Sequence, residues 1–325
     1  CVIDAIKAEA DFGVLGYHRL TDSFRESCCQ WMKTRHDWDV QPDWIVPFEQ
    51  VVPALYNAVW TFTQPGDGIL IQTPDYHHFT GATVNTGRKV LENRLVADEK
   101  GHYTVDFDDF REKAKQAKLF FLCSPQNPTG RVWTEEELRR MGEICNEYGV
   151  MVVADEIHHD LIQPGYKHIV YASLGKEFAD NCVICTSLSK TFNLAGLQAS
   201  TVVFPNAHMK QVFDQFWMNM DIHRNNAFSL TAMEAAFNHG EEWLEQLLPY
   251  LSANFDFVAD YCREHIPQIK TCAPDATYLM WLDCRALGLD NDALRRFMIE
   301  QAGLGLNDGC SFGRSLSGYM RLNAA

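Results

Sequence analysis

The sequence has no run of clustered lysines and arginines, no long uninterrupted apolar stretch and no internal repeat. Acidic residues outnumber basic ones, 43 to 28, which gives a net charge of −15. Nucleic acids and anionic membrane surfaces bind clustered positive charge, so neither is an expected partner. A membrane-spanning helix needs about 18 consecutive apolar residues, and no segment reaches that length. Hydrophobic residues make up 46% and charged residues 22%, which indicates a globular protein rather than a disordered or fibrous one.

Cysteine is frequent, since the chain contains 11, but no disulfide framework is indicated. The cysteines are scattered and odd in number, which is typical of reduced, buried thiols, so we expect a cytoplasmic protein. Cys182 and Cys185 have the C-x-x-C spacing of zinc and redox motifs. They lie in an apolar run that predicts a strand, and residues three apart on a strand point to opposite faces. No metal site is therefore predicted.

The 325 residues are enough for about two domains, at roughly 150 residues per domain. Between about residues 43 and 205, short apolar runs alternate with helical patterns. Thr134 and Glu137 form a predicted capping box at the start of a helix over 134–148. Continuous apolar strands separated by helices predict an α/β fold, with a mostly parallel sheet in a three-layer α/β/α domain. The expected strands cover 69–71, 119–123, 150–154, 182–186 and 199–204.

A smaller α+β domain is expected at the C-terminal side. Helical patterns dominate from 206 to about 266, followed by a strand at 278–282, a helix at 291–302 and a last strand from 319. We expect a large domain over 15–245 and a small domain over 246–325, with residues 1–14 packing on the small domain. The first residues have a pattern typical of the middle of a helix, and the last residues have a pattern typical of a strand. Both ends therefore look cut, and we expect a fragment.

Three polar clusters follow three of the predicted strands, at 124–130, 155–160 and 187–193. Ligands of open α/β sheets bind at the carboxyl ends of the strands, where these clusters would meet. Taken singly, each has an ordinary explanation: a turn at 127–130, a helix cap at Asp155 and a solvated Lys190. Their shared position favours a functional site.

These clusters resemble the fold-type I pyridoxal phosphate (PLP) enzymes of the class I/II aminotransferase superfamily. The resemblance is carried by Asn127-Pro128-Thr129-Gly130, by Asp155-Glu156-Ile157-His158 and by the run from Ser187 to Gln198. Residues 12–17, 131–133 and 321–323 are similar to the cystathionine β-lyase branch, the C–S lyases often called MalY/PatB. The similarity spans nearly the whole chain, which lacks only an N-terminal arm and a C-terminal helix relative to that branch.

The resemblance implies PLP as the cofactor and gives each residue a role. Lys190 would bind PLP covalently and act as the catalytic base, and Asp155 would face the pyridine nitrogen. Asn127 and His158 would bond the phenolic oxygen. Ile157 and Tyr76 would lie against the two ring faces.

The phosphate and the substrate engage further residues in such a site. Ser187 and Ser189 match hydroxyl donors to the phosphate, aided by a helix that begins near Gln50. Tyr17 matches a tyrosine that reaches the phosphate from the neighbouring subunit, which implies a homodimer with shared active sites. Arg321 matches the arginine that binds the substrate α-carboxylate as a fork.

Two positions depart from the pattern of the superfamily. Gln198 stands where many members carry a phosphate-binding arginine, as it does in the lyase branch. Glu49 precedes the helix near Gln50, where the branch has a small or glycine-containing turn, and its carboxylate would repel the phosphate unless it points away.

The implied activity is β-elimination of sulfur amino acids, cystathionine or cysteine S-conjugates, to a thiol, pyruvate and ammonia. An aminotransferase would use the same residues, and a PLP-containing regulatory binding protein is a further alternative. The retention of Lys190, Asp155 and Arg321 favours an enzyme.

Overall fold

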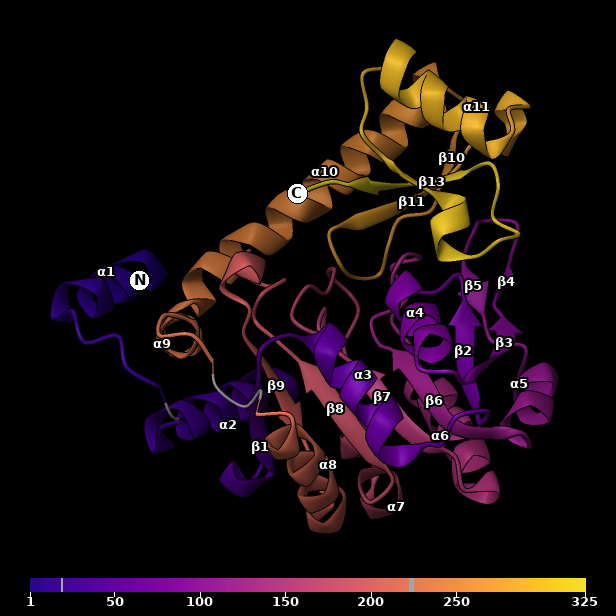
Figure 1. The fold of residues 1–325 in the computed structure, drawn as a ribbon. Coiled ribbons are helices and arrows are strands. Elements are labelled where there is room, and N and C mark those ends of the chain that lie inside the picture. The colour runs from indigo at the N-terminus through magenta and orange to yellow at the C-terminus, as the bar shows by residue number, and fades with distance from the viewer. Residues whose placement is uncertain (19, 222–224) are drawn as a thin grey trace.

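The computed structural model describes residues 1–18, 20–221 and 225–325. It contains a seven-stranded central sheet, a separate four-stranded sheet and a small two-stranded sheet. The long helix α10 (Glu241–His265) runs from the region of the central sheet to the four-stranded sheet (Figure 1).

The central sheet has the strand order β1-β9-β8-β7-β6-β2-β3. Neighbouring strands from β3 to β8 are parallel, whereas β9 is antiparallel to both β8 and β1. The predicted mostly parallel α/β sheet is confirmed. Its strands are β1 (Ile45–Phe48), β2 (Gly68–Thr73), β3 (Lys89–Arg94), β6 (Ala117–Cys123), β7 (Met151–Asp155), β8 (Cys182–Thr186) and β9 (Ser200–Val203).

Both faces of this sheet are buried, which gives three layers. On β8, Cys182 belongs to one hydrophobic cluster and Cys185 to the other, so the two thiols lie on opposite faces as predicted. One face is covered by α3 (Val51–Phe62), α4 (His77–Asn85) and α8 (Ala207–Asn219). The other face is covered by α2 (Asp22–His36), α5 (Phe107–Ala114), α6 (Glu135–Tyr148), α7 (Lys176–Ala179) and α9 (Ser229–His239).

Local sequence signals account for the position of β7. The capping box starts α6, because the Thr134 hydroxyl accepts from the Glu137 amide and the Glu137 carboxylate accepts from the Thr134 amide. Gly149 ends the helix with a φ of 66°, a left-handed conformation that glycine adopts without steric cost. The following strand β7 ends on Asp155, one residue later than predicted, so this carboxyl lies at the edge of the sheet.

The small domain is built on the antiparallel sheet β10-β11-β13-β12. We retain a domain boundary near residue 245, in the first turns of α10, as a proposal. The predicted helix at 291–302 is present as α11 followed by a π-helical turn over Phe297–Gln301. The elements of this domain are β10 (Lys270–Thr271), β11 (Leu279–Asp283), α11 (Asn291–Arg296), β12 (Asn307–Asp308) and β13 (Tyr319–Asn323).

The first helix lies elsewhere than expected. Residues 1–14 were expected on the small domain, but α1 (Val2–Phe12) packs against α9 (Figure 1). Glu9 accepts a hydrogen bond from Thr231 of α9, and the Cys1 thiol lies 3.6 Å from the His239 carbonyl. The helix has no fully buried residue, and its apolar Ile3 and Phe12 remain exposed, so its apolar pattern does not indicate which domain it contacts.

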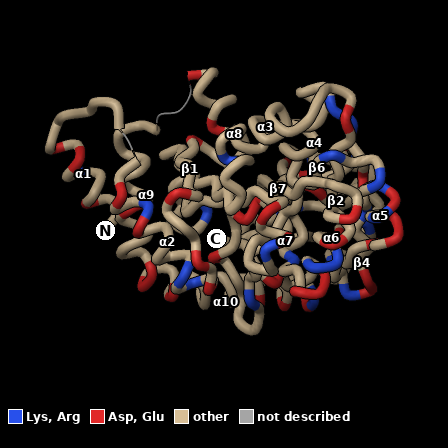
Figure 2. Tube along the Cα trace, turned by 90° about the horizontal axis from the view of Figure 1, so that it is seen from below, with Lys and Arg blue, Asp and Glu red and all other residues tan. Residues whose placement is uncertain are grey.

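Charged residues of both signs are distributed along the chain trace (Figure 2). In Figure 2, lysines and arginines are interspersed with the more numerous acidic residues along the chain. Within the described ranges, no helix combines the length and apolar character needed to cross a membrane.

Candidate active site

The carboxyl ends of three adjacent strands define a cavity of about 410 Å³. Cys123 of β6 pairs with Asp155 of β7, which pairs with Cys185 of β8, so the loops after these strands start side by side. The cavity contains nine of the ten residues predicted for the site. These are Tyr76, Asn127, Asp155, Ile157, His158, Ser187, Ser189, Lys190 and Arg321.

The loop after β6 is held rigidly, which fixes Asn127. The Gln126 side-chain oxygen accepts from the Thr129 amide at 3.0 Å, and its amide donates to the Pro74 carbonyl. Gly130 has a φ of 74°, and a Cβ there would lie 2.3 Å from Pro274 Cβ. Only glycine meets both requirements, so the last position of the turn is constrained by the small-domain segment against it.

Asp155 is a buried carboxyl with an unusual proton affinity. Burial raises the pKa of Asp155 to about 7, although the nearby charge of Lys190 and a hydrogen bond from the Ile157 amide at 3.2 Å act against it. Among the described residues no cation forms an ion pair with it. A cationic group entering the cavity beside Asp155 would therefore stabilise the ionised carboxylate.

The aromatic residues of the cavity are neutral. Burial, helped by the charges of Lys190 and Arg321, lowers the pKa of His158 to about 3. Burial, helped by the charge of Asp155, raises the pKa of Tyr76 to about 12. The Nδ1 atom of His158 is buried without a hydrogen-bond partner, so this imidazole has an unused polar atom at the cavity.

Arg321 is held by uncharged groups. Its Nη1 donates to Asn127 Oδ1 and its Nη2 to Asn307 Oδ1, both at 2.8 Å. The guanidinium lies over the ring of Phe312, 4.6 Å from the centroid, and Nε is buried without a partner. Because no carboxylate among the described residues pairs with it, its positive charge remains available to an anionic ligand.

The helix α3 provides an anion-binding terminus at the other end of the cavity. Its N-cap Gln50 makes no side-chain capping bond, and Gln50, Val51 and Val52 all line the cavity. The unpaired amides of a first helical turn favour phosphate. The Ser187 hydroxyl already donates to the Ala199 carbonyl at 2.6 Å and accepts from the Ser189 amide. Ser189 is thus better placed than Ser187 to donate a hydroxyl to a phosphate.

The two residues that depart from the family pattern differ in position, because Gln198 lines the cavity and Glu49 does not. Gln198 lines the cavity, with a left-handed φ of 53° at the end of a short 3₁₀ turn. Glu49 is not among the lining residues, although its neighbour Gln50 is. The expected repulsion between Glu49 and a phosphate therefore does not follow from this geometry.

Tyr17 is the one predicted site residue that the structure leaves outside the cavity. It lies between α1 and α2 and is 88% exposed. Within one chain it does not contribute to the cavity lining.

The lining residues that sequence reasoning missed include three with polar side chains, His77, Tyr278 and Asn307. Tyr278 packs its ring against His158, with centroids 5.7 Å apart. Asn307 reaches Arg321 because β12 pairs with β13. Neither belongs to a recognisable motif, and only the pairing of distant segments brings them to the site.

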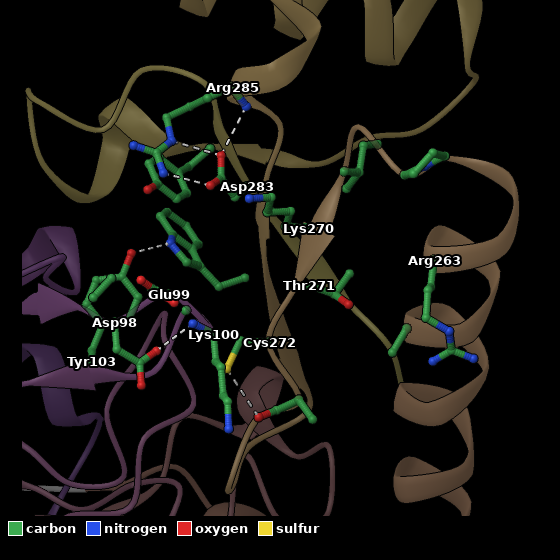
Figure 3. Close-up of a pocket in the computed structure, with 18 residues that line it drawn as sticks. Asp98, Glu99, Lys100, Tyr103, Arg263, Lys270, Thr271, Cys272, Asp283 and Arg285 are labelled. Carbon is green, nitrogen blue, oxygen red and sulfur yellow. Dashed lines mark hydrogen bonds and ion pairs between the residues drawn. The ribbon is translucent and has the colours of Figure 1, made fainter.

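A larger cavity, of about 640 Å³, lies elsewhere, between residues 97–103 and the small-domain sheet. Figure 3 shows that its charged groups include the bidentate pair of Arg285 and Asp283. It contains none of the three strand ends, so its size does not make it the better candidate.

The smaller cavity fits PLP. Asp155 offers a buried acid for a ring nitrogen, α3 offers amides for a phosphate, and Lys190 offers an amine. His158 and Arg321, which also line the cavity, each have a buried nitrogen without a hydrogen-bond partner in the protein.

Comparisons with known proteins identify the family to which the chain is similar. Residues 1–325 match the family Aminotransferase class I and II. The cystathionine beta-lyase PatB of Bacillus subtilis is 40% identical over 325 residues, covering 99% of this chain and 84% of that protein.

Two solved structures share the fold. Cystalysin from Treponema denticola, which contains pyridoxal 5′-phosphate, is 36% identical with a TM-score of 0.97, covering 100% of this chain and 82% of that one. The PLP-bound C–S lyase from Staphylococcus hominis is 31% identical with a TM-score of 0.92, covering 99% and 82%.

The raised pKa of Asp155 predicts a pH dependence of stability in the protein without bound ligand. The folded state holds this proton up to about pH 7, whereas the unfolded chain releases it near its ordinary value of 3.8. The folded state thus carries more protons in between, so its stability falls as pH rises through this window, by up to about 1.4 kcal/mol per pH unit.

We expect Asp155→Asn to remove this decline, measured as urea unfolding of the ligand-free protein from pH 5 to 8. Asp43→Asn, an exposed site with the same charge change, is the control and should keep the wild-type profile. Parallel pH profiles for wild type and Asp155→Asn would show that the buried carboxyl does not titrate in this range.

Proposed function

This chain belongs to the aminotransferase class I and II family, and we propose that it is a lyase that removes the β-sulfur substituent of cysteine-derived amino acids. Pyridoxal 5′-phosphate is its cofactor. The observation that carries the proposal is one cavity that combines Lys190, a buried Asp155 and an Arg321 without an acidic partner. Its closeness to a cystathionine β-lyase favours elimination as the reaction.

Each part of the cofactor has a matching group in the cavity. Asp155 would hold its carboxylate beside the pyridine nitrogen, and Asn127 and His158 would hydrogen-bond the phenolic oxygen. Ile157 and Tyr76 would enclose the ring. Ser189 and the first turn of α3 would bind the phosphate, with Ser187 bracing the loop.

When bound, PLP accepts the electron pair that is left at Cα of an amino acid when its proton departs. The protein supplies the proton transfer and the orientation. Lys190 would hold the cofactor before substrate arrives and then, as a free amine, take the Cα proton. Arg321 would hold the α-carboxylate and so fix which face of Cα is presented to Lys190.

The overall reaction consumes one water. The Cβ–S bond breaks, the sulfur leaves as a thiol, and the three-carbon fragment hydrolyses to pyruvate and ammonia. An aminotransferase would instead conserve the Cβ–S bond and yield a sulfur-containing keto acid, so the products separate the two activities.

We predict that the PLP-loaded protein incubated with cystathionine forms pyruvate, ammonia and free thiol in equal amounts. Lys190→Ala should lower this rate by several orders of magnitude, because it removes both the covalent attachment and the base. Pyruvate is measured by coupled reduction and thiol by a chromogenic disulfide. Formation of a keto acid that retains sulfur, without thiol, would replace the lyase proposal by transamination.

We also propose a homodimer in which Tyr17 serves the phosphate of the partner subunit. In support, Tyr17 lies outside its own cavity, in the segment 12–17 that resembles the interface-crossing segment of the family. A phenol bonded to a phosphate oxygen is charge-assisted and contributes about 1.5–3 kcal/mol. Tyr17→Phe should therefore weaken PLP binding roughly ten- to a hundred-fold.

A purified heterodimer of one Tyr17→Phe chain and one Arg321→Ala chain tests the crossing. If Tyr17 crosses, both lesions fall in one site and the other site is intact, so about half of the wild-type activity remains. If Tyr17 acts within its own chain, each site carries one lesion and neither is normal.

The mirror-image control pairs a wild-type chain with a chain that carries both substitutions. Crossing then places one lesion in each site and leaves none intact. An intact site in this control, together with none in the first heterodimer, would refute the shared site.

A further inference from the structure

The residue that follows the catalytic lysine is anchored to a buried carboxylate outside the cavity. We propose that Asp160 is a positioning residue for Lys190, acting through the hydroxyl of Thr191. This inference rests on the function proposed for Lys190.

Asp160 is the centre of a buried hydrogen-bond cluster. Its side chain is fully buried, and its two oxygens have three hydrogen-bond partners and one longer contact with an imidazole nitrogen. Oδ1 faces Trp31 Nε1 at 3.1 Å and His36 Nε2 at 2.9 Å, both from α2. Oδ2 accepts from the Thr191 hydroxyl at 2.7 Å and lies 3.4 Å from His159 Nε2.

The ionised state of the Asp160 carboxylate suits it to hold the Thr191 hydroxyl. Burial acts to raise its pKa, but the charge and hydrogen bond of His159 and those of His36 outweigh burial and hold the pKa well below its usual range. An ionised carboxylate with well-placed donors forms stronger and shorter hydrogen bonds than a neutral acceptor. Asp160 can therefore fix the position of a neighbouring segment.

The anchored segment is the one that carries the reactive amine. Thr191 is completely buried, and the next residue, Phe192, packs edge-on against Trp31 with ring centroids 5.9 Å apart. Two successive residues after Lys190 are thus attached to Asp160 and α2. Lys190 itself lines the cavity and has no hydrogen bond from Nζ to any described residue, so its backbone anchors decide where the amine can reach.

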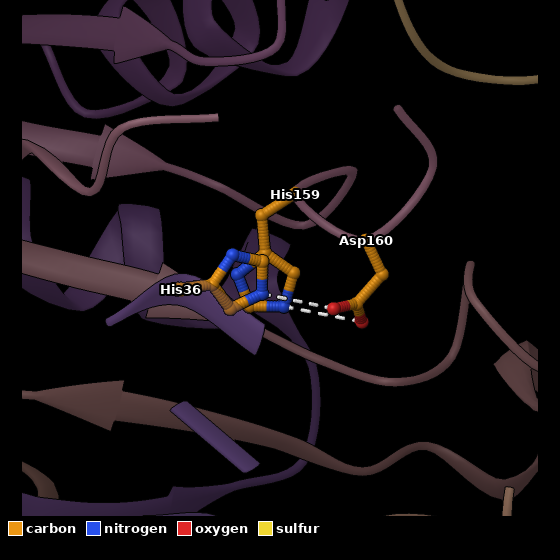
Figure 4. A group of neighbouring side chains, drawn as sticks. All are labelled: His36, His159 and Asp160. Carbon is orange, nitrogen blue, oxygen red and sulfur yellow. Dashed lines mark hydrogen bonds and ion pairs between the residues drawn. The ribbon is translucent and has the colours of Figure 1, made fainter. Parts of the chain in front are cut away.

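The same cluster resembles a metal site in composition, but its geometry favours hydrogen bonding. The rings of His36 and His159 are stacked, with centroids 4.3 Å apart and planes at 26° (Figure 4). Ligand lone pairs lie in the ring planes, so those of stacked rings run nearly side by side instead of converging on one ion. Both Nε2 atoms point to Asp160, which satisfies them without a metal (Figure 4).

The test removes the single hydroxyl. Thr191→Val keeps the shape of the side chain and leaves the hydrogen bonds of Asp160 with Trp31 and His36 in place. Thr191→Ser restores the hydroxyl, and Thr83→Val is the matched control. Thr83 is equally buried, but its hydroxyl donates only to the Phe79 carbonyl in α4.

Three properties of each variant are measured. They are the rate at which the cofactor-free protein attaches PLP covalently, the pH midpoint of the visible absorbance of the loaded protein, and the steady-state constants kcat and KM. We expect Thr191→Val to slow attachment and lower kcat by about tenfold or more, since small misplacements of a reacting group have effects of this size. The midpoint should shift while KM changes little. Thr191→Ser should recover these values to within about twofold, and Thr83→Val should match wild type in all three.

The positioning role would be overturned if Thr191→Val had a lower melting temperature but matched wild type in PLP attachment, in the pH midpoint and in turnover. Asp160 would then contribute to folding stability alone. Asp160→Asn, which keeps the shape but removes the charge, should show the same direction of change if it folds. A wild-type protein that attaches no PLP would instead refute the proposed function, so the two failures are distinguishable.

Discussion

The site depends on the alignment of three parallel strands. Parallel neighbours end at the same edge of a sheet, so β6, β7 and β8 deliver three loops to one place regardless of their separation in sequence. Both faces of the sheet are buried, so alternate side chains of each strand pack against the helices on opposite faces. This packing fixes the register of each strand and therefore the place where its loop begins. Asp155 and Lys190 are brought together by this arrangement, and the small domain adds Arg321 from its own sheet.

The polar groups of the cavity are left incompletely paired by the protein itself. Asp155 is buried with little compensation, His158 and Arg321 each have a buried atom without a partner, and the first turn of α3 has no side-chain cap. Each feature costs folding stability, and a ligand with a cationic ring and a phosphate would compensate Asp155 and the first turn of α3. Outside the cavity the opposite holds, since both oxygens of Asp160 are fully used. Incomplete hydrogen bonding therefore distinguishes the polar groups that would bind a ligand from those, such as Asp160, that stabilise the fold.

Sequence reasoning was most successful where the signal is local. Thr134 with Glu137 predicted the start of α6, and the apolar runs predicted the sheet, with β7 off by one residue. Nine of the ten predicted site residues line one cavity, and seven of them come from the three clusters at strand ends. The packing of α1 was mispredicted because its apolar residues do not indicate which domain they contact, and Ile3 and Phe12 remain exposed. Asn307 was missed because only strand pairing brings it to Arg321. The anchoring of Thr191 by Asp160 was likewise invisible, because it joins residues 31 positions apart.

The most direct test is to identify the residue that carries the cofactor. Borohydride converts the covalent link between PLP and its lysine into a stable amine, which peptide mapping by mass spectrometry then locates. We expect a single label on Lys190 of the loaded wild-type protein, and its loss on incubation with excess amino-acid substrate before reduction. A label on another lysine, or no label on a protein that has bound PLP, would contradict the assignment of this cavity as the active site.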